Sequence, residues 1–487
     1  MKKLIRQLAS ESAIYGLSGI LTKLINVFLV PLYTRILLPS DYGVLNLINT
    51  TFYFVGIFVV FALDNSVARW FFDNEDEKER KKPVASWFWF QFAVAVFVAI
   101  IFILLSSPLS KLIVNKDLSQ LFIIPSITII SSILPTIIWN WLRLQRKPWL
   151  TVGLSTASIL LTITLNVVFT IVLKMGIKGI LLAALVSNSV YSLVAIALMK
   201  DWLNWKYFSL DVLKKMLIYA LPLLPTSLAF WILNSSSAYF LNAYWTKDEV
   251  GLYSIGSSIA SAVSIVIGAF QMAWGPFAFS IMNKPEAKRV YSTVLTLYTL
   301  VATFTALTVA LFSKEVLLIF TTSKYYPAYL VSGILSFNAI IYGFAYVGSI
   351  GSSIAKKTSP VAIAVLLGSV LTVVSYFLLV PHLGKEGAAI STLIGYTIIP
   401  IYVFYRSQKL WQIPYKFFPA IIILCAALGL FILNSVLPVY SMGYAIFIKL
   451  VLLFSFLVVA LVTVYFNYKK EFNNLLQTRR FKFQFIK

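Results

Sequence analysis

Long apolar runs alternate with short polar breaks along almost the whole chain. Each run is long enough for a helix to cross a bilayer, which takes about 20 residues. The runs are continuous, whereas barrel strands would give segments of about ten residues with alternating polarity, so helices are predicted. Allowing about 20 residues per crossing, we predict about fourteen transmembrane helices, at residues 12–36, 42–64, 84–105, 119–142, 151–173, 180–199, 214–242, 249–280, 290–312, 326–354, 361–380, 387–405, 416–435 and 444–467.

Composition agrees with this pattern. Hydrophobic residues make up 60% of the 487 and charged residues 12%, against roughly 25% charged in an ordinary soluble domain. Such a chain cannot cover a globular surface with polar groups, so we predict an all-α polytopic membrane protein. The amino-terminal run has a basic start, but Glu11 and Lys23 interrupt it and no small-residue cleavage site follows. It is therefore predicted to be a retained first helix rather than a signal peptide.

The basic residues are distributed unevenly over the two sides of the predicted bundle. The amino terminus, the even-numbered loops and the tail carry 29 of the 40 Lys and Arg, and the odd-numbered loops carry 9. The positive-inside rule then predicts that both termini are cytoplasmic. The net charge of +23 is mostly this topogenic charge facing anionic lipid, so nucleic acid is not an expected partner.

The second half of the chain repeats the first at an offset of 208 residues. LYTRILLPSDYGVL at 32–45 corresponds to FLNAYWTKDEVGLY at 240–253, which aligns Asp41 with Glu249 and Gly43 with Gly251. GIKGILLAALVSN at 176–188 corresponds to GKEGAAISTLIGY at 384–396 at the same offset. Separate matches at one ungapped offset indicate an internal duplication.

The repeat predicts the organisation of the molecule. It contains six spans, an even number, so both copies enter the membrane in the same direction and are parallel repeats. We therefore expect two six-helix lobes, with substrate binding at the interface between them. The predicted units are an N-terminal lobe (1–205), a C-terminal lobe (206–410), helices 13 and 14 (411–467) and a basic cytoplasmic tail (468–487).

Several short motifs resemble those of a known family. PLYTRILLPSDYGVL at the end of the first helix, VARWFF after the second and the G-x-x-G-A-A pattern at 384–389 are similar to the polysaccharide-lipid flippases, the O-antigen and capsule repeat-unit exporters of the MOP transporter superfamily. The resemblance implies alternating access by two lobes in a bacterial cytoplasmic (inner) membrane. It also implies an undecaprenyl diphosphate-linked glycan as cargo, membrane lipids as surroundings, and polysaccharide polymerase machinery as a partner.

Polar side chains that recur at helical spacing mark a candidate cavity. Thr22, Lys23 and Asn26 share one side of the first helix, and Asn49 and Tyr53 share one side of the second. A Lys near mid-membrane costs roughly 2.5–3.5 kcal/mol to insert, so it should face water or an anion. Lys23 is thus the main candidate for holding a diphosphate, while the amides and hydroxyls would bind sugar.

Two of these assignments leave alternatives open. Lys23 alternatively pairs with Asp64 or with a backbone carbonyl. Asn26 and Asn234 occupy equivalent places in the repeats. They line one cavity from both lobes or, equally, form interhelical hydrogen bonds.

Other charged residues stand near the predicted helix ends. Arg35 and Asp41 form either a gate on the outer face or ordinary interface anchors, and Asp64 and Arg69 either admit substrate on the cytoplasmic side or simply end the second helix. Lys449 is only the sixth residue of its span and is expected to extend its side chain outward.

Two prolines interrupt the seventh predicted span. Pro222 and Pro225 lie within one helical turn of each other and free backbone groups that must be satisfied elsewhere. They mark either a hinge or a static kink.

Missing motifs narrow the function further. The chain has one cysteine, Cys425, and one histidine, His382, and it has no G-x-x-x-x-G-K-[ST] motif, so no metal site, cofactor or ATP hydrolysis is expected. Asp64 is the single carboxylate inside a predicted span, which disfavours a MATE-type exporter of cations. A membrane glycosyltransferase or polymerase is the other alternative. It would need an acid or base at an outer site, whereas the longest loop, 65–83, lies on the basic side. We therefore expect a flippase without enzymatic activity.

Overall fold

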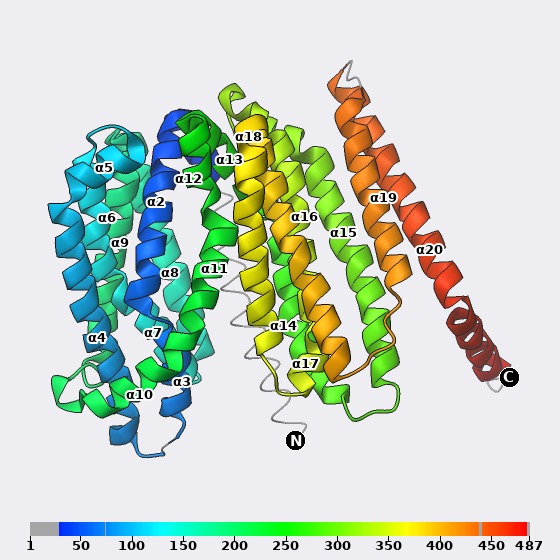
Figure 1. Cartoon of the computed structure of the whole chain (residues 1–487), viewed down its shortest axis with the longest axis horizontal. Helices are drawn as coiled ribbons and strands as arrows, with labels where there is room; N and C mark the ends of the chain where they lie inside the picture. The colour runs from blue at the N-terminus through cyan, green and yellow to red at the C-terminus, as the bar shows by residue number, and fades with distance from the viewer. Residues whose placement is uncertain (1–28, 74, 438–440, 485–487) are drawn as a thin grey trace.

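The computed structural model describes residues 29–73, 75–437 and 441–484, with side chains in the last segment described as far as residue 469. Helices account for nearly all of these residues (Figure 1). The first half contains α2 (Pro39–Val60), α3 (Leu63–Phe71), α4 (Glu77–Leu104), α5 (Ser106–Val114), α6 (Ser119–Ser131), α7 (Ile133–Leu144), α8 (Pro148–Val167), the π-helix η1 (Val168–Val172), α9 (Gly176–Met199) and the short 3₁₀ helix η2 (Trp205–Tyr207).

The second half continues the same pattern. It contains α10 (Leu210–Ala220), η3 (Leu221–Leu223), α11 (Leu224–Ser235), α12 (Ser237–Tyr244), α13 (Lys247–Ala260), α14 (Val263–Ile281), α15 (Ala287–Phe320), η4 (Ser323–Ala328), α16 (Tyr329–Gly348), α17 (Ile350–Ile354), α18 (Ser359–Leu410), α19 (Phe417–Val436) and α20 (Met442–Gln484).

The helices are those of a multi-pass membrane protein. Twelve helical segments in the described part of the chain are long and apolar enough to cross a bilayer. One of them, α18, has 52 residues and turns at Gly384, where φ is 53°. Its two halves pack closely against each other. The evidence is at Gly395, where a Cβ would lie 2.7 Å from the carbonyl oxygen of Gly368. α18 therefore crosses the membrane twice. Most of the first predicted helix, 12–36, lies outside the described residues.

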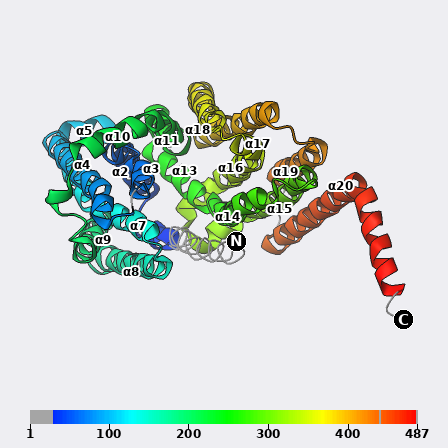
Figure 2. The same ribbon diagram turned by 90° about the horizontal axis from the view of Figure 1, so that it is seen from below.

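Two lobes stand side by side. Seen from below, α2 to α9 form one group and α13 to α18 form the other, with α19 and α20 on the far side of the second group (Figure 2). α10 follows the predicted boundary at 205, yet it packs on α3 and α4 of the first lobe. The exact lobe boundaries therefore remain predictions.

The repeat is visible in the backbone. Gly176 and Gly384, which the offset of 208 aligns, have positive φ values of 56° and 53°. Each of these glycines lies at the turn between one span and the next, which crosses its lobe in the opposite direction. Glycine is favoured here because a Cβ is strained in this left-handed region.

Several predicted spans are divided in the structure, and the sequence predicts such a break only in span 214–242, at Pro222 and Pro225. Predicted span 42–64 breaks at Phe61 and Ala62, between α2 and α3, and span 249–280 breaks between α13 and α14. Span 214–242 divides into α10, η3, α11 and α12, with Pro222 in the first turn of η3 and Pro225 in that of α11. Apolar content alone does not reveal such breaks, because each broken segment remains equally hydrophobic.

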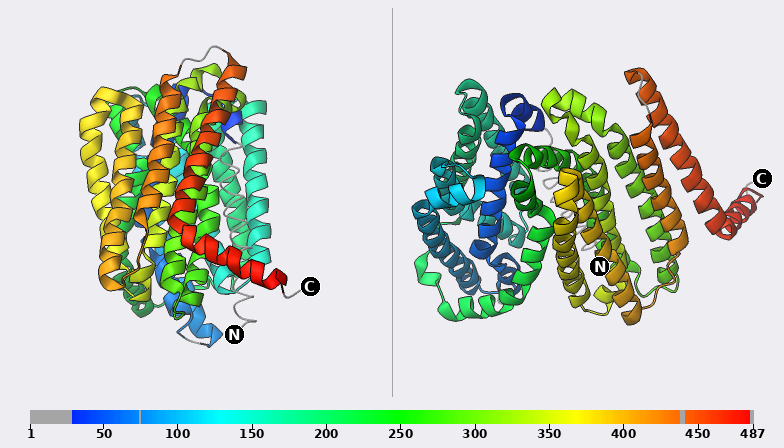
Figure 3. Two further views of the ribbon diagram at one scale, coloured as in Figure 1. Left: turned by 90° about the vertical axis from the view of Figure 1, so that its right-hand side faces the viewer. Right: turned by 45° about the horizontal axis from the view of Figure 1, so that its top comes forward.

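The last helix extends beyond its predicted span. α20 continues from the membrane-spanning part into residues predicted as a separate tail, and it changes direction at Tyr468 (φ −121°, ψ 15°). Figure 2 and Figure 3 show this final stretch turning sideways and leading away from the other helices. Lys416 stabilises the bend, because its Nζ donates to the carbonyl oxygen of Asn467 at 2.8 Å.

Candidate functional site

The two lobes meet at the upper end of the molecule as drawn in Figure 1, where α2 packs along α13. The closest approach is between Gly43 and Gly251, which are equivalent in the repeat. A Cβ on Gly43 would lie 1.9 Å from the carbonyl oxygen of Lys247, and one on Gly251 would lie 2.0 Å from that of Pro39. Only glycine at both positions permits this contact.

Hydrogen bonds extend the contact downward. Asn46 Nδ2 donates to Ser254 Oγ at 2.9 Å, and these two residues are again separated by 208 positions. The hydroxyls of Thr51 and Tyr239 lie 2.7 Å apart, and Trp231 Nε1 donates to the carbonyl oxygen of Thr50 at 3.2 Å. We call this set of contacts between α2 and α11 to α13 the upper closure.

Below the upper closure, the described helices of the two lobes pack on each other less extensively. Within the described part of the chain, α3 and α7 of the first lobe make no extensive packing contact with α14 or α17 of the second. Packing between the lobes thus closes the bundle at its upper end. These four helices do not close it at its lower end.

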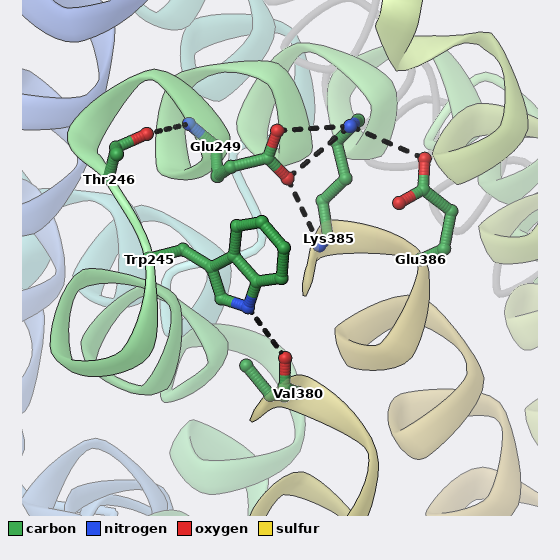
Figure 4. Close-up of polar contacts among 6 residues, drawn as sticks. All are labelled: Trp245, Thr246, Glu249, Val380, Lys385 and Glu386. Carbon is green, nitrogen blue, oxygen red and sulfur yellow. Dashed lines mark hydrogen bonds and ion pairs between the residues drawn. The ribbon is translucent and has the colours of Figure 1, made fainter. Parts of the chain in front are cut away.

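An ion-pair cluster supports α13 from within its own lobe (Figure 4). Lys385 Nζ lies 3.1 and 3.3 Å from the two carboxylate oxygens of Glu249, and the Lys385 backbone N–H donates to the same carboxylate at 3.2 Å. Trp245 Nε1 donates to the carbonyl oxygen of Val380 at 2.7 Å, and Thr246 Oγ1 accepts from the Glu249 N–H at 3.4 Å. The cluster fixes the start of α13, the helix on which α2 packs, to the turn of α18.

A polar cavity lies directly below the upper closure, in the second lobe. Its volume is about 410 Å³, within the roughly 300–1,000 Å³ typical of small-molecule sites. Five helices line it, and none of the lining residues is charged. They are Phe230, Leu233, Asn234, Tyr253, Ser257, Ala260, Ser261, Ser264, Ile267, Gly268, Gln271, Leu335, Asn338, Ala339, Tyr342, Tyr346, Thr392 and Tyr396.

Internal contacts orient much of this lining. Tyr396 donates to Asn234 Oδ1 at 2.7 Å, and Asn234 Nδ2 donates to the carbonyl oxygen of Phe230 at 2.7 Å. The rings of Tyr342 and Tyr396 meet edge to face with centroids 5.8 Å apart. Asn338 differs, because its Oδ1 is buried and accepts no hydrogen bond from the described residues.

The predicted binding residues are placed as follows. Asn234 is exposed to the cavity and is one of its lining residues. Asn49 is exposed, and Tyr53, on the same side of α2, is 59% exposed. Thr22, Lys23 and Asn26 lie outside the described residues, so their roles stay predictions.

The ion pair considered for the gate is not formed among the described residues, and the two residues considered for substrate entry lie together on α3. Among the described residues Arg35 and Asp41 form no ion pair. Asp41 instead caps α2, because its Oδ2 accepts from the Leu38 N–H at 3.2 Å. Asp64 and Arg69 follow the break that ends α2, and Arg69 pairs with Asp73 at 2.5 Å.

Two predictions about charge inside the membrane are wrong. α15 runs to Phe320, beyond the predicted end at 312, and so contains Glu315, a carboxylate that the predicted spans left outside. Lys449 does not extend outward, because both Glu315 oxygens lie 2.6 Å from its Nζ and the residue is 5% exposed. The adjacent charges of Lys314 and Glu315 look like a helix end in the sequence, whereas packing against α20 neutralises Glu315 inside the bundle.

The sequence profile of a family described as polysaccharide biosynthesis protein matches residues 32–330, more than half of the chain. The chain belongs to this family. No protein with curated annotation matches it closely by sequence. The matched region contains the upper closure and most of the helices that line the cavity.

Solved structures show which fold this family member has. The chain is similar to a structure described as lipid II flippase MurJ in an inward closed conformation, with a TM-score of 0.71 and 15% identity over 94% of this chain and 100% of that one. It is also similar to an inward-facing multidrug resistance MATE transporter of the MOP superfamily, with a TM-score of 0.63 and 17% identity over 82% and 97% of the two chains. The chain thus has the fold of these MurJ and MATE structures.

Sequence reasoning missed most of the cavity lining in this family member. Asn338, Tyr342 and Tyr346 recur every four residues along α16, as do Tyr253, Ser257 and Ser261 at α13. Polar stripes of the same kind on the first two helices mark the predicted cavity, so the sequence of α13 and α16 carries the signal for this lining. In the described residues no cluster of three or more His, Cys, Asp or Glu could hold a metal ion.

Proposed function

We propose that the protein moves a lipid diphosphate-linked oligosaccharide from the cytoplasmic to the outer leaflet by alternating access, in the bacterial cytoplasmic membrane. The observation that carries the proposal is the position of the cavity. An uncharged polar cavity lies directly below a contact that closes the two lobes at one end. Membership of the polysaccharide biosynthesis family and the MurJ-like fold support a lipid-linked glycan as the cargo.

The proposed cycle follows from this arrangement. The glycan enters between the lobes from the open end while its lipid tail stays in the bilayer. Asn234 of the second lobe and Asn49 and Tyr53 of the first offer it hydrogen bonds, and Lys23 holds the diphosphate as a point charge. Separation of Gly43 from Gly251 and rupture of the Asn46–Ser254 bond then open the upper end.

The charge-free cavity favours this cargo over a cationic drug. A MATE-type exporter of cations needs a buried carboxylate, and Glu315 is already neutralised by Lys449 outside the cavity. The transporter fold, which extends over most of the chain, disfavours a glycosyltransferase or polymerase.

A reversible crosslink tests the proposal. Asn46→Cys and Ser254→Cys, in a Cys425→Ala background, are joined by a short reducible crosslinker, and translocation of a fluorescent undecaprenyl diphosphate oligosaccharide is followed in proteoliposomes. We expect the crosslink to abolish translocation and reduction to restore it, because the upper closure must open in each cycle. The matched control joins Ser107→Cys to Asp117→Cys, which lie in contact within one lobe and should leave activity unchanged.

The same assay tests the diphosphate site. We expect Lys23→Ala to lose most translocation at matched reconstitution. An unaffected Lys23→Ala variant would remove Lys23 from the site while leaving the flippase proposal in place. Failure of the uncrosslinked protein to move any lipid-linked glycan, together with transport of cationic drugs, would instead favour the MATE-type function.

A further inference from the structure

The side chains that line the cavity indicate which part of the cargo it binds. Eleven of its eighteen lining residues have polar side chains, and all of these are hydroxyls, phenols or amides. Each of these groups can donate or accept a hydrogen bond. Sugar hydroxyls need both kinds of partner.

An ionic ligand would be poorly stabilised here. The lining has no Lys, Arg or His to pair with a phosphate or carboxylate, and no Asp or Glu to pair with an ammonium group. Burying an ion without a partner is costly, whereas a neutral polar group needs only hydrogen bonds. The cavity therefore discriminates against charge of either sign.

One group in the wall lacks a partner. Asn338 Oδ1 is buried and has no donor among the described residues, and a buried acceptor without a donor destabilises the folded protein. The acceptor stands four and eight residues before Tyr342 and Tyr346, on the helix side that lines the cavity. Because Oδ1 has almost no exposed surface in this conformation, a ligand hydroxyl donates to it only when the Asn338 amide turns toward the cavity, and that hydrogen bond would remove the cost.

The tyrosines add an apolar component. Tyr342 contacts both Tyr346 and Tyr396 edge to face, with centroids 5.2 and 5.8 Å apart. Such a cluster gives rigid ring surfaces beside hydroxyl groups, which suits a sugar ring with its apolar faces and polar rim.

We infer that the cavity is a subsite for uncharged sugar residues of the glycan, separate from the place where the diphosphate is held, with Asn338 as a specificity-determining acceptor. This inference rests on the proposed flippase function and names the chemistry of its cargo. A glycan with neutral hexoses or N-acetylhexosamines at the positions that reach this cavity binds, and one with uronic acids there does not.

Binding of soluble saccharides to the purified full chain in nanodiscs tests the inference. The probes are a neutral trisaccharide and its counterpart with one uronic acid, both without lipid and diphosphate, measured by calorimetry. We expect the neutral probe to bind at least tenfold more tightly. Asn338→Leu should weaken neutral binding about tenfold, while Asn434→Leu on α19, outside the cavity, should not.

A charge-introducing variant separates specificity from folding. Gln271 lines the cavity and is exposed, so Gln271→Lys should be tolerated, and it should shift preference toward the uronic acid probe. Equal binding of both probes by the unmodified chain, no binding of the neutral probe, or no shift in Gln271→Lys overturns the inference. Translocation of the lipid-linked glycan, measured on the same preparations, shows whether the flippase proposal itself still stands.

Discussion

The ion pair between Glu315 and Lys449 joins α15 of the second lobe to α20. The two side chains are 10% and 6% exposed, and the Lys449 ammonium also lies 5.7 Å from the Phe312 ring centroid. Both charges lie within predicted membrane spans. Either charge alone would be unstable there, so each depends on the other for its burial.

Removing one partner of this ion pair should therefore lower the free energy of unfolding more than removing both. We expect Lys449→Met to lower the free energy of unfolding by about 3–5 kcal/mol, because it leaves a buried carboxylate without a partner. The double variant Glu315→Gln, Lys449→Met should recover most of that loss. Thermal unfolding in detergent measures both effects.

The matched control is the exposed pair of Lys215 and Asp211, whose side chains are 59% and 72% exposed. Lys215→Met should change stability by less than about 1 kcal/mol. A Lys449→Met protein as stable as the parent would show that Glu315 is readily protonated or hydrated in place.

At the scale of the element, the break between α2 and α3 is the most unusual backbone feature. Phe61 and Ala62 both have left-handed backbone angles, with φ of 52° and 51°, which costs roughly 1–2 kcal/mol per residue for a side chain other than glycine. Gln91 of α4 offsets part of this cost, since its Nε2 donates to the freed carbonyl oxygen of Val60 at 3.1 Å. The break lets α3 leave the direction of α2 near the lower end of the first lobe.

Glycine at the break should relieve this strain. We expect Ala62→Gly to raise the free energy of unfolding by about 1 kcal/mol, whereas Ala99→Gly inside α4 should lower it by roughly 0.5–1 kcal/mol. Thermal unfolding of the two variants side by side checks the opposite signs. If both substitutions destabilise equally, the left-handed conformation at Ala62 is not a source of strain.

At the scale of the molecule, the two ends of the bundle differ in charge and in packing. The upper end carries the closure of the lobes, and the lower end carries most of the basic loops. The positive-inside rule predicts that the lower end and both termini are cytoplasmic. The conformation described here would then be open toward the cytoplasm.

Thiol labelling of intact cells tests this orientation. In a Cys425→Ala background, Asn115→Cys at the upper end should react with a membrane-impermeant maleimide added outside, and Lys147→Cys at the lower end should react only after lysis. Both positions are exposed, so access should depend on the side of the membrane. The reverse labelling pattern would invert the proposed direction of transport.

The sequence by itself determined most of the membrane spans, the internal duplication and which residues of the two repeats correspond. Apolar runs must form helices in a membrane because no water satisfies the backbone there, and an even number of spans makes the repeats parallel. The offset of 208 already paired Gly43 with Gly251, and the structure brings these two residues into contact. The same offset aligned Asn234 with Asn26, and the structure places Asn234 in the lining of the cavity.

The tertiary structure decided which charges meet and where the helices break. Glu315 and Lys449 are separated by 134 residues, and no local pattern shows that one will neutralise the other. Asp41 and Glu249 are equivalent in the repeat, yet one caps a helix and the other binds Lys385. Local physics sets periodicity and topology, whereas the pairing of charges and the unpaired acceptor of Asn338 depend on which helix packs beside which.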